Sequence, residues 1–270
     1  MRRQTNSKRY IFHADATGVA GEIFHPFQEL IPVQAASALP ANGGFGSARA
    51  EMFRHREIVS FSAAYTEVMG RATEHDVFET SAVSVVENFN LLDVVTCDRM
   101  VGRLTGRHPG AGKLGSSTPQ ETAILPTGSR FEGLRIGNTY FDRLEVAPPF
   151  FCQPEHAYWS GLLSAVERDR GQLSRLTLPD DDGKPVPLPE TGQKPEFLGF
   201  SLALAEPQQG FELGAPLRFD IPHFGIVHLG EYFCDATSRR LIMLRAELGC
   251  TVQGWVIAGD PIIDGAPYPP

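Results

Sequence analysis

Cysteine is scarce in this 270-residue sequence, and its four copies stand far apart. Cys97, Cys152, Cys234 and Cys250 form no pair at the C-x-x-C spacing of redox and metal-binding motifs. Four cysteines are also too few for a disulfide framework in a chain of this length. We therefore expect them to be small, buried, apolar residues.

Long apolar runs and an excess of basic residues are missing too. No stretch approaches the roughly 18 apolar residues of a membrane helix. Residues 10–24, which follow a basic amino terminus, are interrupted by charged residues where a signal peptide has an unbroken apolar run. The default expectation is thus a cytoplasmic protein, with export by a non-classical route left open. Because 24 Lys and Arg face 32 Asp and Glu, the net charge of −8 argues against a nucleic-acid partner.

The common catalytic and phosphate-binding motifs are absent as well. G-x-S-x-G and H-E-x-x-H do not occur. Residues 110–115 superficially resemble a phosphate-binding loop, but Arg107 stands where its first glycine belongs, and Leu114 replaces the hydroxyl residue that would hold magnesium. Residues 37–47 are glycine-rich without the G-x-G-x-x-G spacing, which predicts a hairpin or tight corner. The sequence therefore predicts no cofactor.

What the sequence does contain is the two-residue apolar alternation of half-buried strands, punctuated by 27 Gly and 21 Pro. The alternation predicts strands at residues 59–66, 217–221 and 242–248. The β-branched runs at 83–86 and 94–96 predict further strands, and beside the second we interpret Leu91, Leu92, Val94 and Val95 as buried on both sides. Turns are predicted at Asn42-Gly43-Gly44, Gly137-Asn138 and Asp264-Gly265.

One segment has the period of a helix. Trp159, Leu162, Leu163 and Val166 recur at helical spacing within residues 156–170. Two polar stretches, 106–126 and 179–195, predict flexible surface loops, the second at the edge of a loop and helix insertion at about 150–215. We predict a single all-β domain over 1–270, a sandwich or barrel-like fold with this one amphipathic helix. The alternative is two domains divided near residue 150, although the residues beyond Pro195 are few for a second core.

The eight histidines offer one metal-like arrangement. His223, His228 and Glu231 provide two imidazoles and a carboxylate, which suit zinc or non-haem iron. On a strand, however, side chains five residues apart point to opposite faces. We therefore predict no metal site and keep these three residues as weak candidates. His228 and Glu231 also remain candidates for binding a small molecule.

The densest basic cluster is Arg54-His55-Arg56. On a strand, Arg54 and Arg56 face the same way and together suit a carboxylate or phosphate. The alternative is an exposed row of cross-strand ion pairs with neighbouring glutamates. Both interpretations place these side chains on a sheet surface.

The segments 84–101, 131–138, 221–231 and 241–248 contain apolar strands separated by Gly and Asn turns. In this order they resemble the bacterial choice-of-anchor surface proteins of the P type, which are β-rich and largely uncharacterised. The resemblance covers about half the chain. It implies a β fold with a closing strand that ends at Glu231. The chain departs from that family because it shows no signal peptide, sorting motif or anchor, so only the fold is implied.

Two functions remain open. The first is a non-enzymatic structural or interaction protein of a bacterium, associating with itself or another protein through strand edges, in keeping with abundant strands and 18 Phe. The second is a small-molecule-binding or metal-dependent barrel enzyme, with a polar pocket formed by His228, Glu231, Arg54 and Arg56. Oligomeric state and cavity chemistry distinguish the two.

Overall fold

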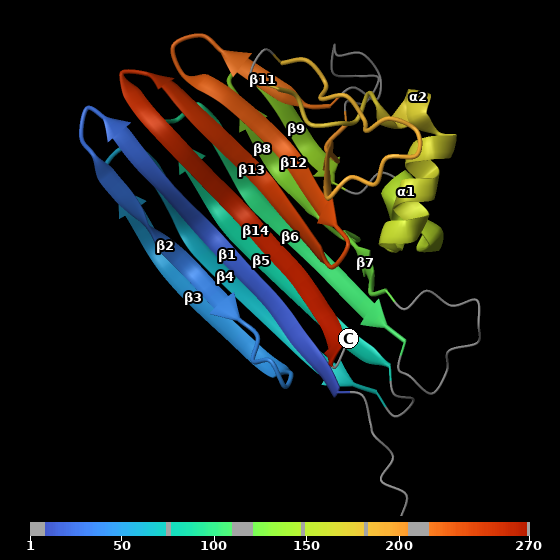
Figure 1. Cartoon of the computed structure of the whole chain (residues 1–270). Coiled ribbons are helices and arrows are strands. Elements are labelled where there is room, and N and C mark those ends of the chain that lie inside the picture. The colour runs from blue at the N-terminus through green and yellow to red at the C-terminus, as the bar shows by residue number, and fades with distance from the viewer. Residues whose placement is uncertain are drawn as a thin grey trace, which may run out of the picture.

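The chain folds into two antiparallel β-sheets, seen here in a computed structural model that describes residues 9–73, 77–109, 121–146, 149–180, 183–204 and 216–268. Both sheets have seven strands and both are open, which confirms the all-β prediction (Figure 1). Sheet A runs in the order β10 (Phe197–Ser201), β12 (Gly225–Asp235), β13 (Ser238–Cys250), β14 (Val252–Tyr268), β1 (Arg9–His25) and β2 (Glu29–Ala38), with β11 (Arg218–Ile221) paired to β12. Sheet B runs β3 (Gly44–His55), β4 (Val59–Ala72), β5 (Phe78–Leu91), β6 (Val95–His108), β8 (Arg130–Ile136) and β9 (Thr139–Glu145), with β7 (Ala123–Leu125) paired to β6.

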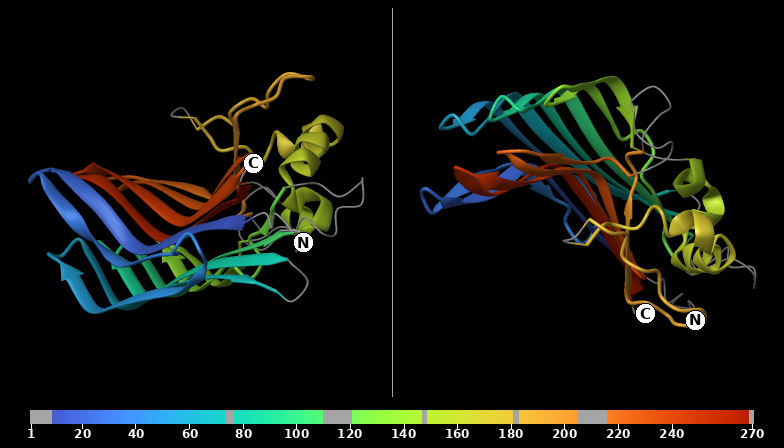
Figure 2. Two further views of the ribbon diagram at one scale, coloured as in Figure 1. Left: turned by 60° about the horizontal axis from the view of Figure 1, so that its bottom comes forward. Right: turned by 90° about the horizontal axis from the view of Figure 1, so that it is seen from above.

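The two sheets stack face to face as a sandwich (Figure 2). Strand β1 lies over β4 and β5, and β14 lies over β5 and β6. The apolar side chains between them form one large core cluster. A polar contact also crosses this interior, because the Ser84 hydroxyl donates to the Thr17 carbonyl over 2.8 Å. Within the described residues no strand pair joins the sheets, so the fold is a sandwich and not a closed barrel.

Most of the predicted strands and turns are confirmed. The segments 59–66, 83–86, 217–221 and 242–248 fall in β4, β5, β11 and β13, apart from Leu217, which precedes β11. Turns occur at 41–42 and 137–138, and residues 39–43 form the corner that carries the chain from sheet A to sheet B. The turn predicted at Asp264-Gly265 is wrong, since both residues lie inside β14.

The strand predicted at 94–96 is confirmed from Val95, where β6 begins, and Leu91 and Val95 are buried, but the interpretation of Leu92 and Val94 as buried strand residues is wrong. Leu91 pairs with Val95, and the three residues between them form a hairpin turn in which Leu92 and Asp93 have φ of 54° and 56°. Asp93 is exposed, and its backbone N–H donates to the Asn90 side chain. Side-chain capping by Asn90 and Asp93 offsets the unusual left-handed backbone.

The in–out alternation reverses once within many of the long strands. In β5, Val86 and Phe89 both face the core although they stand three residues apart, and Asn88 between them has φ of 51°. Left-handed residues recur at the corresponding place on alternate strands of both sheets: Ala35 in β2, Met52 in β3, Gly133 in β8, Gly230 in β12 and Gly259 in β14. These bulge-like positions let both halves of a strand bury apolar side chains.

The predicted helix is present as α1 (Trp159–Arg168), preceded by the 3-10 turns η2 (Pro149–Cys152) and η3 (Pro154–Ala157) and followed by the single turn α2 (Arg170–Leu173). Leu162, Ala165 and Val166 are buried on its inner face. Phe151 contacts Phe200 and Tyr232 of sheet A, while η3 lies against β7 of sheet B. The helical segment therefore bridges the two sheets on one side of the sandwich.

The two predicted loops, 106–126 and 179–195, differ in how much of each the structure describes and in how it packs. Residues 110–120 of the first lie outside the described chain, while 106–108 belong to β6 and 123–125 form β7. In the second, Leu188 is buried, and the Arg170 guanidinium donates to the carbonyls of Leu188 and Pro189 over 2.8 and 2.6 Å. Beyond this loop, β10 pairs with β12, so the segment contributes a strand to sheet A. None of the described helices is both long and apolar enough to span a membrane.

Candidate functional site

The Arg54-His55-Arg56 cluster lies where β3 turns into β4. Arg56 has φ of 52° and belongs to the turn, so it does not share a strand face with Arg54 as the spacing predicted. Arg54 is ion-paired with Glu57, and the Arg56 Nε donates to Glu29 Oε2 over 2.7 Å. Both guanidiniums are thus paired with carboxylates of the chain, although neither pair joins neighbouring strands of one sheet as the ion-pair interpretation expected.

These pairs fasten one edge of the sandwich. Glu29 begins β2 in sheet A, whereas Arg56 follows β3 in sheet B, so their ion pair bridges the sheets. The Arg56 guanidinium also lies 4.5 Å from the centre of the Phe27 ring. His55 Nε2 approaches the same Glu29 carboxylate at 3.8 Å. The small cavity beside this turn, about 150 Å³, is lined by Arg54, Arg56 and other residues of β3–β5 and their turns, and it does not include His228 or Glu231.

His228 and Glu231 form part of a second cluster, in β12 of sheet A. Glu231 is only 2% exposed, and Arg245 of β13 binds its two carboxylate oxygens with two parallel hydrogen bonds of 2.7 Å. His228 lies opposite Arg245 in the strand register, with its Nδ1 3.8 Å from Glu231 and its Nε2 3.5 Å from Glu247. A buried carboxylate held by a bidentate guanidinium is a stable structural pair.

The charge state of His228 follows from this setting. Burial lowers its pKa below the ordinary value, and the positive charge of Arg245 adds to the effect, while Glu231 and Glu247 oppose it. The neutral imidazole is therefore favoured in the folded protein. The Glu231 carboxylate beside it is paired on both oxygens with Arg245.

The third weak metal candidate lies apart from the other two. His223 is an exposed turn residue with φ of 62° between β11 and β12. Across the residues with assigned positions, no three His, Cys, Asp or Glu side chains come together in a way that suits a metal ion. The Glu231 carboxylate is instead taken up by Arg245.

The cysteines behave as small apolar residues where they are described. Cys97 and Cys234 are free and buried, and burial raises the pKa of each thiol to about 12. Thiols with so high a pKa are protonated at neutral pH and are poor nucleophiles. Cys152 is half-buried, and burial raises the pKa of its thiol too.

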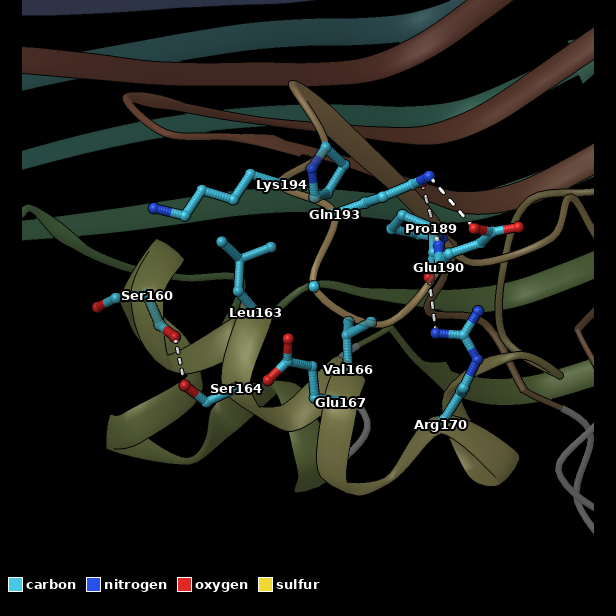
Figure 3. A pocket seen from close by; sticks show the side chains of 12 residues that line it. Ser160, Leu163, Ser164, Val166, Glu167, Arg170, Pro189, Glu190, Gln193 and Lys194 are labelled. Carbon is cyan, nitrogen blue, oxygen red and sulfur yellow. Dashed lines mark hydrogen bonds between the residues drawn. The ribbon is translucent and has the colours of Figure 1, made fainter.

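A cavity of about 410 Å³ separates α1 from the proline-rich segment 189–195 (Figure 3). Leu163 and Val166 line it from the helix, and Arg170 reaches across to the Pro189 carbonyl. Its charged groups are balanced, since Glu167 and Glu190 accompany Arg170 and Lys194. We interpret this cavity as a packing gap between α1 and the segment 189–195, and not as a ligand site.

The most distinctive surface is the edge opposite the helices. Open sheet edges expose unpaired backbone groups, and proteins usually blunt them with short strands, proline or lysine. Edge strands β9 and β10 are short, at seven and five residues, and β2 carries Pro32. Strand β3 has twelve residues, no proline and no lysine, and no described strand pairs with its outer side.

Exposed apolar side chains gather beside this edge. Among the residues whose exposure is known, six of the ten exposed large hydrophobic side chains lie between residues 24 and 52: Phe24, Phe27, Leu30, Val33, Phe45 and Met52. Met52 is 83% exposed and Leu30 68%. We call β2, β3 and their flanking turns the open side, and the helical segment 149–173 with β9, β10 and β11 the covered side. Clustered exposed apolar groups are typical of interaction surfaces.

Sequence reasoning found some of these residues and missed others. The alternation in 242–248 placed Arg245 and Glu247 on the outer face, but only the register of β12 with β13 shows that they complete the His228–Glu231 cluster. Arg239 was missed entirely. It is 2% exposed, its Nη1 donates to the Asp235 and Ser238 carbonyls, and its guanidinium lies 5.6 Å from the centre of the Trp159 ring. It thereby holds α1 against the β12–β13 hairpin.

Comparison with known proteins gives one finding. Residues 10–158 match a family described as a domain of unknown function (DUF8256), a stretch that contains all of sheet B, β1 and β2 of sheet A, and η3. No curated protein matches the chain, and no solved structure matches it. The open side lies entirely within the matched residues.

Proposed function

The chain belongs to the DUF8256 family, whose function is unknown, and we propose that it is a non-enzymatic interaction module that associates with a second copy of itself through the outer edge of β3. The observation that carries this proposal is the twelve-residue edge of β3, which has no described partner strand on its outer side, together with six exposed apolar side chains. Edge-to-edge strand pairing supplies main-chain hydrogen bonds for such an association.

A second copy is favoured because the sequence of β3 complements itself. Arg49 and Glu51 are two residues apart on one face and form an exposed ion pair of 2.6 Å. If two β3 strands pair antiparallel about a two-fold axis centred on Ala50, residues equidistant from Ala50 stand opposite each other. Arg49 of each copy then faces Glu51 of the other. The four charges form a square of alternating sign, which favours this register.

Charge reversal tests this arrangement. The Arg49→Glu variant places four negative charges at the interface, and Glu51→Arg places four positive ones. Each cross-strand pair contributes about 0.2–1 kcal/mol, and like charges are destabilising. We expect each single variant to raise the dimer dissociation constant about tenfold or more, measured by sedimentation velocity.

Two combinations sharpen the test. The double variant Arg49→Glu/Glu51→Arg restores the alternating square and should dimerise like the native protein. An equimolar mixture of the two single variants should form a heterodimer, since one copy is then wholly negative and the other wholly positive at these positions. A monomer in all forms, or single variants that dimerise unchanged, contradicts the proposal.

The chain provides a matched control. Arg143 and Glu145 form an equivalent exposed pair of 2.6 Å in β9, the edge strand on the opposite side of sheet B. Arg143→Glu changes the net charge by the same amount as Arg49→Glu and should leave the association unchanged. Equal weakening by both variants would indicate a general charge effect and not pairing through β3.

Two earlier expectations stay proposals. The cytoplasmic location is one of them, with export by a non-classical route as its alternative, and cell fractionation tests it. The alternative enzyme or small-molecule site at His228, Glu231, Arg54 and Arg56 has less support, because the two halves of that site lie in different sheets and their charges pair with groups of the chain.

A further inference from the structure

A second cavity lies on the outer face of sheet B, away from the open side. It has a volume of about 510 Å³, within the usual size range of small-molecule sites. Its floor is formed by side chains of β4, β5 and β6, and its wall by β7, η3 and Tyr158, the residue before α1. We call this cavity the arginine groove.

Three arginines and one glutamate line the groove. Arg71, Glu79 and Arg107 form one cross-strand row, because Glu79 pairs in register with both of the others. The Glu79 Oε2 accepts hydrogen bonds from Arg71 Nε and Nη2 over 2.9 and 2.7 Å. Arg103 lies four residues before Arg107 on the same face of β6, with Thr105 between them.

Arg103 and Arg107 have no ion-pair partner among the residues that the structure describes. Elsewhere the charged groups that line cavities balance one another: Arg54 pairs with Glu57, and Arg245 pairs with Glu247. The arginine groove thus carries an uncompensated positive charge in a protein whose net charge is −8. Guanidinium groups bind carboxylate, sulfonate or phosphate oxygens in a bidentate manner.

The wall of the groove is apolar. Met69 and Leu125 contribute aliphatic side chains, and Pro154, Ala157 and Tyr158 contribute the helical side. Ala157 is buried, and η3 packs on β7, so this wall is held in place by the fold. Ser81 and Thr105 add hydroxyls between the arginines. Apolar walls with a few convergent polar groups are typical of ligand sites.

We propose that the arginine groove binds a small organic anion, with its acidic group on Arg103 and Arg107 and its aromatic or aliphatic body against Leu125 and Tyr158. The proposal is independent of self-association, because the groove shares no residue with β3. It also requires no catalytic group.

A pair of fluorescent probes of nearly equal shape tests the proposal. The sulfonate 1-anilinonaphthalene-8-sulfonate carries an aromatic body and one negative charge, and N-phenyl-1-naphthylamine lacks the charge. We expect the full-length protein to bind the sulfonate at least tenfold more tightly than the amine, with an affinity that falls as salt rises. Equal affinity for the two probes would overturn the proposal.

Substitutions then locate the site. Arg103→Gln and Arg107→Gln should each weaken sulfonate binding about tenfold and leave amine binding unchanged. Arg135→Gln is the matched control, since Arg135 is an exposed arginine of the same sheet whose guanidinium lies over Tyr140, outside the groove. All three side chains are exposed, so thermal unfolding should be unchanged and report that each variant is folded. Native-like sulfonate binding by the Arg103→Gln/Arg107→Gln double variant, or equal weakening by Arg135→Gln, refutes the assignment.

Discussion

The two lateral sides of the sandwich differ in the length of their edge strands and in how far they shield apolar side chains from water. On the covered side, the edge strands are short, and the helical segment places Phe151 and Leu162 in the core, each no more than 2% exposed. On the open side, β2 and β3 are longer, the chain merely turns from one sheet to the other, and Leu30, Val33 and Met52 stay in water.

The comparison shows which side of the sandwich is covered by the chain's own residues. On the covered side the helical segment buries Phe151 and Leu162, and Arg239 holds α1 against the β12–β13 hairpin, although Tyr140 of β9 and Phe197 of β10 stay exposed. On the open side the Arg56–Glu29 pair and the corner at 39–43 tie the sheets together, and the outer edge of β3 has no described partner strand. The following substitutions test this contrast, from the largest expected effect to the smallest.

Removing a side chain from the covered side should be the most damaging change. Phe151 is 2% exposed and contacts Phe150, Phe200 and Tyr232. Phe151→Ala should lower the free energy of unfolding by about 3–5 kcal/mol, because it leaves a cavity in the core. Val33→Ala on the open side, where the side chain is 57% exposed, should change it by less than about 0.5 kcal/mol in the monomer. Urea titration at low protein concentration measures both, and equal losses would contradict the contrast.

Glycine replacement compares the backbone of the two sides. Gly230 in β12 has φ of 64°, and an added Cβ would lie 2.7 Å from a Val146 methyl and 2.8 Å from the Ala203 nitrogen. Gly230→Ala should therefore cost about 2 kcal/mol or more, from strain and from overlap. Gly44 on the open side has φ of 119° but open space around it, so Gly44→Ala should cost only about 1 kcal/mol. Thermal unfolding of the two variants gives the order.

The pH dependence of stability reports on His228, which lies beside the covered side. Its pKa is lowered by burial and by Arg245, so the unfolded chain binds this proton more readily than the folded protein. The associated stability is present above the ordinary histidine pKa of about 6.5 and is lost as the pH falls below it. His228→Asn should flatten the decline in unfolding free energy between pH 7 and pH 5. A native-like slope in the variant would show that the proton binds elsewhere.

The smallest expected effect is an increase in stability. Met52 has φ of 51° and is 83% exposed, so its side chain gains little from the fold while its backbone is strained. Met52→Gly should raise the free energy of unfolding by about 0.5 kcal/mol. Ala48→Gly in the same strand, at a position without positive φ, should lower it by a similar amount. A loss in both variants would show that Met52 makes contacts that its exposure does not reveal.

Periodicity predicted the fold class because a half-buried strand needs only local alternation. The same alternation could not locate Asn88 or Gly230. At these residues the backbone has positive φ, and the alternation of buried and exposed side chains shifts by one residue. Periodicity also misread 92–94, since a hairpin made of Leu92, Asp93 and Val94 has the composition of a strand. A turn with leucine at positive φ is stabilised by Asn90 and Asp93, and composition alone gives such capping little weight.

The site predictions show the same limit. Arg54 and His55 lie in β3, but Arg56 lies in the turn that follows, and its partner Glu29 belongs to the other sheet, 27 residues away. His228 and Glu231 share a cluster as their spacing suggested, yet Arg245 determines their chemistry through strand register. The arginine groove is lined by residues of β4, β5, β6 and η3. Because these residues are far apart in sequence, no local sequence pattern predicts the groove.

The pairing of β1 with β14 has a consequence for biosynthesis. Sheet B is a run of neighbours in sequence, so its hairpins are able to form while translation proceeds. The centre of sheet A joins the first described strand to the last. On the ribosome, β1 therefore lacks this partner strand until β14 has emerged, and we expect the closure of so long a loop to slow folding.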